Sequence, residues 1–230
     1  MNSPNSFPPV ICTVDIVLLT IKDERLHVAL WRREREPYSG IACLPGGFIH
    51  TNEDTDARAA ALRVMREKTR IEMPYLEQLA TFSGQVRDPR GWSVSIAHYA
   101  LLPFALIDPN QHAEQPEHKL YDVDQLPPLP FDHRAIIDAA VVRLRSKSQY
   151  SSLPCYLLGE SFTLPQLQKL YETLMGEEIN KVSFRRKMAE MDFLEALEGK
   201  MEAAGAHRPA QLHRLKPEYQ DRLRLLNRGF

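Results

Sequence analysis

Two apolar runs near the start of the chain are separated by a short charged turn. Residues 10–21 and 26–34 are rich in β-branched and aliphatic side chains, and residues 22–25 are all charged. This pattern predicts a β-hairpin. Residues 76–85 and 92–106 predict two further strands, because they flank a segment rich in turn-forming residues.

Helical periodicity follows in the segments between and after these strands. Residues 44–71 combine a glycine turn, a cluster of polar N-cap residues and a long helix. A proline-rich passage at 123–133 closes the mixed region, and a helix is predicted from Asp132 to about Ser146. Its apolar stripe consists of Ile136, Ile137, Ala140, Val141 and Leu144.

The pattern changes after a short polar link near residue 150. A helix is predicted to start with Thr163 as N-cap and Pro165 in its first turn, and to end at Gly176. A second helix with Asn180 as its N-cap, and then two short strands around a polar tip at 202–210, complete the pattern of a winged helix-turn-helix. We therefore predict an α/β (α+β) chain with domains at 1–150 and 151–230.

Composition limits the possible functions. The 230 residues are 43% hydrophobic and 26% charged with a net charge of −1, which argues against a chain-wide polyanion binder but permits a local basic face. The three cysteines, Cys12, Cys43 and Cys155, form no CxxC motif and are expected to be reduced. No apolar run reaches membrane-spanning length and no signal peptide is evident, so we expect a cytoplasmic protein without a membrane partner.

The segments 37–48 ("PYSGIACLPGGF") and 65–71 ("MREKTRI") resemble the Nudix family, whose box reads G-x5-E-x7-R-E-U-x-E-E-x-G-U with U aliphatic. The resemblance covers roughly residues 10–126 and implies an α/β/α sandwich with a mixed sheet. Ala42 stands where a tryptophan is usual. Counted from Gly47, the first glutamate falls on Glu53, but the next block fails. Counted back from the second segment, the box fits better and the preceding loop has two extra residues.

In the second register the metal-binding positions lose most of their acids. The family's glutamates at i, i+3 and i+4 correspond to Val64, Glu67 and Lys68. A hard dication needs several oxygen ligands, and a lysine ammonium repels it, so we expect neither a metal site nor catalytic residues. Glu67 is then expected to pair with Arg63 at i,i+4. The helix could serve only packing and ion pairing, but the retained glycine turn favours a ligand-sensing pocket.

Two arginine clusters lie beside this box. The loop 85–92 carries Arg87 and Arg90, suited to a diphosphate, and Trp92, a possible stacking surface; the alternative is a solvated charged turn. An RDPR-type loop also resembles Nudix proteins that handle ADP-ribose. The expected ligand residues are Arg32, Arg33, Arg35, Gly46, Gly47, Phe48, Glu67, Arg87, Arg90 and Trp92.

The second helix of the C-terminal region could enter a DNA groove. Phe184, Met188 and Met191 recur at helical spacing and are expected to anchor it, whereas the opposite surface is basic. Acidic neighbours make the basicity local, and the alternative is a solvated helix in a dimerisation domain. The expected DNA-binding residues are Asn180, Lys181, Ser183, Arg185, Arg186 and Lys187 on the helix, with His207 and Arg208 on the wing.

A disabled Nudix domain followed by a winged helix resembles the Nudix-related transcriptional regulators of NAD metabolism, the NrtR family. Residues 161–188 and 126–134 carry the most specific part of this resemblance. It implies a homodimer that binds palindromic operator DNA, represses NAD biosynthesis or salvage genes, and is released by the effector ADP-ribose without a cofactor. Two alternatives remain: an active ADP-ribose hydrolase, with Glu53 or nearby acids as substitute ligands, and a protein-binding adaptor.

Overall fold

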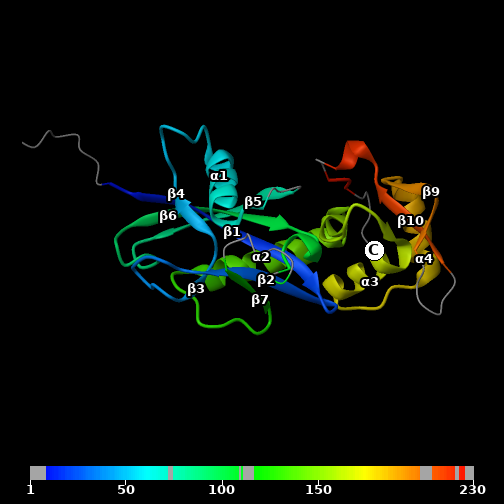
Figure 1. Cartoon of the computed structure of the whole chain (residues 1–230), viewed down its shortest axis with the longest axis horizontal. Helices are drawn as coiled ribbons and strands as arrows, with labels where there is room; N and C mark the ends of the chain where they lie inside the picture. The colour runs from blue at the N-terminus through cyan, green and yellow to red at the C-terminus, as the bar shows by residue number, and fades with distance from the viewer. Residues whose placement is uncertain are drawn as a thin grey trace, which may run out of the picture.

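A mixed β-sheet with a helix on each face forms one end of the molecule, and a small domain of helices and short strands forms the other (Figure 1). The computed structural model describes residues 9–71, 75–108, 110, 117–202, 209–220 and 223–225. The strands of the large sheet are β1 (Ile11–Lys22), β2 (Arg25–Arg32), β3 (Ala42–Cys43), β4 (Gly46–Phe48), β5 (Leu76–Gly84), β6 (Ser93–Leu101) and β7 (His118–Asp122).

The order of this sheet is β3-β2-β1-β6-β5, with β4 paired to β1 and β7 paired to β2. Only the β1–β6 pair is parallel among the described strands, so the sheet is mixed, as expected. The predicted hairpin is confirmed as β1 and β2. Its turn residues Asp23 and Glu24 have φ values of 49° and 58°, the left-handed pair that a tight hairpin turn requires.

Alternate residues of β1 face opposite helices. Val14, Ile16 and Leu18 pack in the cluster that contains α1 (Ala57–Thr69), whereas Val17 and Leu19 pack in the cluster that contains α2 (His133–Ser148). This is the period of two that a strand buried on both faces must show. The sheet is therefore covered by one helix on each side.

Two details of the strand pattern differ from expectation. The strand expected over 92–106 ends at Leu101 because Pro103 follows, and Phe104–Leu106 form a 3-10 turn instead. Strand β7 has no counterpart in the predicted pattern, although it pairs along the edge of β2 from Trp31 to His27.

The C-terminal domain has the predicted winged-helix pattern. It consists of β8 (Phe162–Thr163), α3 (Leu164–Met175), α4 (Lys181–Met191), β9 (Leu194–Glu202) and β10 (Ala210–Leu215). Thr163 and Asn180 accept hydrogen bonds from the first turns of α3 and α4, and Gly176 ends α3 with φ of 75°, which confirms the three predicted boundaries. The predicted wing residues His207 and Arg208 lie outside the described residues.

The link between the two domains is not the polar connection that the sequence suggests. Ser148, Ser151 and Ser152 are fully buried, and the next turn, η2 (Leu153–Leu157), is buried throughout. Ser151 donates to Lys147 O at 2.7 Å and accepts at its carbonyl from Tyr171 Oη of α3 at 2.8 Å. Ser148 Oγ donates to Leu144 O at 2.7 Å and Ser152 Oγ accepts from Arg224 N at 3.0 Å, so all three buried hydroxyls have partners.

One hydrophobic cluster extends through this link from the sheet to α3 and α4, joining Val17 of β1 to Phe184 of α4. A second contact lies at the hairpin turn, where Glu24 pairs with Lys169 of α3 at 3.2 Å. The two domains therefore share a core. None of the helices among the described residues is long and apolar enough to cross a membrane.

Candidate functional site

The short strand β4 places two glycines where no side chain fits. Gly46 pairs with Asp15 of β1, and a Cβ atom on Gly46 would lie 2.1 Å from Asp15 Oδ1. A Cβ atom on Gly47 would lie 2.8 Å from Val64 Cγ2 of α1. The glycine turn is therefore needed for close packing between β1, β4 and α1, and it forms a wall of the candidate pocket.

The metal-binding face of α1 does not fit a divalent cation. Val64 is buried beneath Gly47, and Glu67 accepts from Arg63 Nη1 at 3.3 Å, which confirms the expected i,i+4 pair. Lys68 carries an ammonium one helical turn beyond Val64. Among the described residues, no three His, Cys, Asp or Glu side chains are grouped to hold a metal ion.

Arg63 collects the remaining carboxylates of the box. Its guanidinium donates to both oxygens of Asp54 at 2.8 Å, and Glu53 lies 3.9 Å away. Hydrogen bonding to Arg63 holds the pKa of Asp54 at about 2. Arg63 also donates to Phe48 O of β4 at 2.9 Å. The acids that might have replaced the missing metal ligands therefore surround a cation already.

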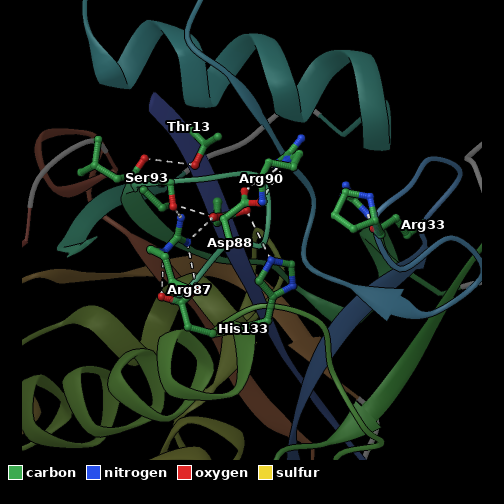
Figure 2. Close-up of polar contacts among 12 residues, drawn as sticks. Thr13, Arg33, Arg87, Asp88, Arg90, Ser93 and His133 are labelled. Atoms are coloured by element: carbon green, nitrogen blue, oxygen red, sulfur yellow. Dashed lines mark hydrogen bonds and ion pairs between the residues drawn. The ribbon is translucent and has the colours of Figure 1, made fainter. Parts of the chain in front are cut away.

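The two arginines of the 85–92 loop have different surroundings. Arg87 is only 7% exposed, donates to both oxygens of Asp132 at 2.9 and 2.8 Å and to Ser93 Oγ at 3.1 Å, and points toward the start of α2 (Figure 2). Its guanidinium is therefore held by protein groups, and its predicted contact with a diphosphate stays a prediction. Arg90 is 35% exposed and is held by Asp88 at 2.6 Å.

An arginine–aromatic cluster brings the second group of expected residues to the same place. Arg33 lies over the ring of Phe131 at 4.9 Å, and Arg90 lies over the same ring at 5.9 Å and over Phe48 at 5.3 Å. Trp92 is about half exposed at the same loop as Arg90. Phe48, Arg90 and Trp92 are exposed and Arg33 and Phe131 are half-buried, and these five residues form the candidate ligand site.

The other predicted arginines are not part of this cluster. Arg32 alternates to the opposite side of β2 and lines a shallow depression with Gly40, Ala42 and Tyr121. Arg35 lies exposed in the loop after β2. The period of two along a strand explains the separation of Arg32 from Arg33, although the sequence does not say which of the two faces the pocket.

A buried polar group beneath the cluster was not predicted. His133 Nδ1 accepts from Leu44 N at 3.1 Å, its Nε2 lies 3.6 Å from Asp15 Oδ1, and Ser95 Oγ donates to Asp15 Oδ2 at 2.6 Å. Burial lowers the pKa of His133, so the neutral imidazole bonds the glycine loop to α2. In the sequence, the only feature that pointed to this buried group was the segment 126–134, in which polar residues follow a run of prolines.

Helix α4 presents the basic face that was predicted. Phe184, Met188 and Met191 are buried, as expected, and the ring of Phe184 packs edge-on against Tyr171 at 5.7 Å. Lys181, Ser183, Arg185 and Arg186 are exposed, and Lys187 is half-buried. The side chain of Asn180 caps the helix, because its Oδ1 accepts from Val182 N and Ser183 N. The exposed N-terminal half of α4 thus offers cationic side chains to an anion.

Comparisons with known proteins agree with this two-part architecture. A NUDIX domain model matches residues 12–140, and a model described as the NrtR DNA-binding winged helix domain matches residues 154–215. The ADPR responsive transcriptional repressor NtrR of Acinetobacter baylyi is 36% identical over 211 residues, which cover 91% of this chain and 84% of that protein.

Two solved structures from Shewanella oneidensis are similar. NrtR complexed with a 27mer DNA has a TM-score of 0.87 at 38% identity and covers 95% of this chain and 99% of that chain. The NUDIX domain of NrtR complexed with ADP ribose has a TM-score of 0.54 at 37% identity and covers 62% of this chain and 93% of that chain. Since both domain models match in this order and the similarity extends over nearly the whole length, the chain belongs to the NrtR family.

Proposed function

We propose that this chain is a cytoplasmic, ADP-ribose-responsive repressor of NAD biosynthesis or salvage genes, and that it binds palindromic operator DNA as a homodimer. The observation that carries the proposal is a domain that keeps the Nudix glycine turn, has Val64 and Lys68 at acid positions, and shares one core with a winged helix whose α4 has a locally basic surface. The relatives named above, a repressor responsive to ADPR and a protein crystallised with DNA and ADP ribose, support it.

The ligand is expected at the arginine–aromatic cluster. Arg33 and Arg90 supply two guanidinium groups for a diphosphate, while Phe48 and Trp92 offer half-exposed aromatic faces for a base. Hydrolysis is not expected, because Glu53, Asp54 and Glu67 all contact Arg63 and form no metal group. No cofactor is part of the proposal.

The DNA is expected at α4. Arg185 and Arg186 are exposed on its outer face and can read guanine, and Lys181 lies at the helix N-terminus, where it can contact phosphate. A dimer would present two such helices, and half-sites about one DNA turn apart would then be bound together.

One experiment tests the whole proposal. A duplex selected from a random library by the protein is titrated by fluorescence anisotropy with and without ADP-ribose, beside an assay of AMP formation from ADP-ribose with Mg²⁺ and sedimentation of the protein–DNA complex. We expect ADP-ribose to weaken binding, no turnover, and two protein chains per duplex. Rapid hydrolysis of ADP-ribose without an effect on DNA would favour the hydrolase, and binding of neither ligand would favour an adaptor.

A further inference from the structure

Three consecutive residues at the head of α2 contact every segment of the candidate pocket. Phe131 contacts Arg33 and Arg90, Asp132 accepts both hydrogen bonds from Arg87, and His133 accepts from Leu44 N. These partners belong to the loop after β2, the 85–92 loop and the glycine loop. Residues 131–133 thus join the three pocket loops to the helix that leads into the winged domain.

Phe131 has an unusual backbone conformation. Its φ is 55°, in the left-handed region that bulky side chains rarely adopt. Its ring is held from several sides, by two guanidinium groups, by the edge of Tyr38 at 5.0 Å and by His133 at 5.4 Å. Such a conformation persists only where its surroundings impose it, so a change in those surroundings can release it.

The far end of α2 is fixed in the shared core. Leu144 and Ser148 are fully buried, and Lys147 and Arg143 both donate to Glu77 of β5 at 2.7 and 3.0 Å. The chain then continues through buried serines and η2 to α3. Because packed interiors transmit displacement rather than absorb it, a change in the first turn of α2 bears on the winged domain.

We propose that Phe131, Asp132 and His133 are the positioning residues through which the effector controls DNA binding. This inference rests on the proposed function and names the regulation of the same site. A diphosphate bound between Arg33 and Arg90 draws both cations from the ring of Phe131. The cations then no longer hold the ring and its left-handed backbone, and the first turn of α2 shifts with Asp132 and His133 attached.

The test compares the ratio of DNA dissociation constants with and without saturating ADP-ribose. We expect the wild-type ratio to lie within about 5–150, the usual range of allosteric coupling. Phe131→Leu removes the ring face that the cations contact, and Asp132→Asn removes the charge that Arg87 contacts; each is expected to lower the ratio at least three-fold. Phe131→Tyr retains the ring face and is expected to restore the wild-type ratio.

Matched controls exist elsewhere in the chain. Phe104→Leu removes an aromatic ring that lies 5.8 Å from the Lys22 ammonium. Asp138→Asn removes an ion pair on the exposed face of α2, in which Arg134 Nε lies 2.9 Å from Asp138 Oδ1. Both are expected to keep the wild-type ratio. Equal ratios in the wild type, Phe131→Leu and Asp132→Asn would overturn the inference, whereas a wild-type ratio of one would overturn the proposed function itself.

A measurement on the unmodified protein covers variants that fail to fold. Amide hydrogen exchange of the first turn of α2 is followed with and without ADP-ribose. We expect ADP-ribose to change exchange at residues 131–137 and to leave the 3-10 turn Phe104–Leu106 unaffected. Unchanged exchange across 131–137 under saturating ADP-ribose would overturn the inference.

Discussion

Replacing Gly46 by alanine tests the packing of the glycine turn against β1. The added Cβ would lie 2.1 Å from Asp15 Oδ1, about 1.4 Å short of an ordinary contact near 3.5 Å. Asp15 cannot simply rotate away, because it is buried and accepts from Ser95 Oγ at 2.6 Å. Either β4 moves off β1 or the carboxylate gives up this hydrogen bond.

Both responses destabilise the fold. Overpacking of a rigid interior costs about 1–3 kcal/mol, and breaking a hydrogen bond to a charged group adds about 1.5–3 kcal/mol where that also occurs. A destabilisation of roughly 1–6 kcal/mol follows for Gly46→Ala, which corresponds to a fall in Tm of about 2–24 °C for a chain of this size.

Differential scanning calorimetry of Gly46→Ala beside Gly159→Ala isolates the clash. At Gly159 no heavy atom lies within 4 Å of the place that a Cβ atom would occupy, so this variant reports only the backbone effect of replacing glycine. In an Asp15→Ala background, Gly46→Ala should cost less than in the wild type, because the clashing carboxylate is gone. The same Tm for Gly46→Ala and Gly159→Ala would contradict the conclusion that Gly46 lies too close to Asp15 for a side chain to fit.

Three further predictions concern the two domains. Val64→Glu with Lys68→Glu should raise Mg²⁺-dependent ADP-ribose hydrolysis above the wild type, measured as AMP formed; wild-type turnover of about 1–10³ per second would contradict a metal-free pocket. Arg185→Ala with Arg186→Ala should weaken specific DNA binding by about 1–3 kcal/mol for each arginine that reads a base, whereas Arg145→Ala on α2 should match the wild type in fluorescence anisotropy. Thermal unfolding followed by tryptophan fluorescence, which reports only the Nudix domain, should coincide with circular dichroism, since one core joins both domains; separate midpoints would refute this.

Local signals were sufficient for much of the fold. The apolar runs predicted β1, β2 and β5, and the caps Thr163 and Asn180 marked the starts of α3 and α4, because each depends on neighbours within a few residues. Strand β7 was missed because it is a short edge strand whose residues are mostly half-exposed, so it has no apolar run to mark it.

The candidate site depended more on partners distant in sequence. Arg87 is followed at once by an acidic residue and soon by a second arginine, which resembles a solvated ligand loop, but its carboxylate partner Asp132 lies 45 residues further along the chain. The neighbouring residues in the sequence do not distinguish an arginine that pairs with a carboxylate of the protein from one that binds an anionic ligand. The left-handed conformation of Phe131 is likewise imposed by its tertiary contacts, since its residue type disfavours it.

The shared core constrains how ligand binding can act at a distance. Where domains are joined by a solvated linker, a ligand can close one domain without disturbing the other. Here Ser148, Ser151 and Ser152 are buried between the sheet and α3, and the Glu24–Lys169 pair adds a second contact at the hairpin turn. A movement at the head of α2 must therefore shift the winged domain as a body or strain the joint. Either outcome changes the free energy of presenting α4 to DNA, and by linkage DNA must change the affinity for the effector by the same factor.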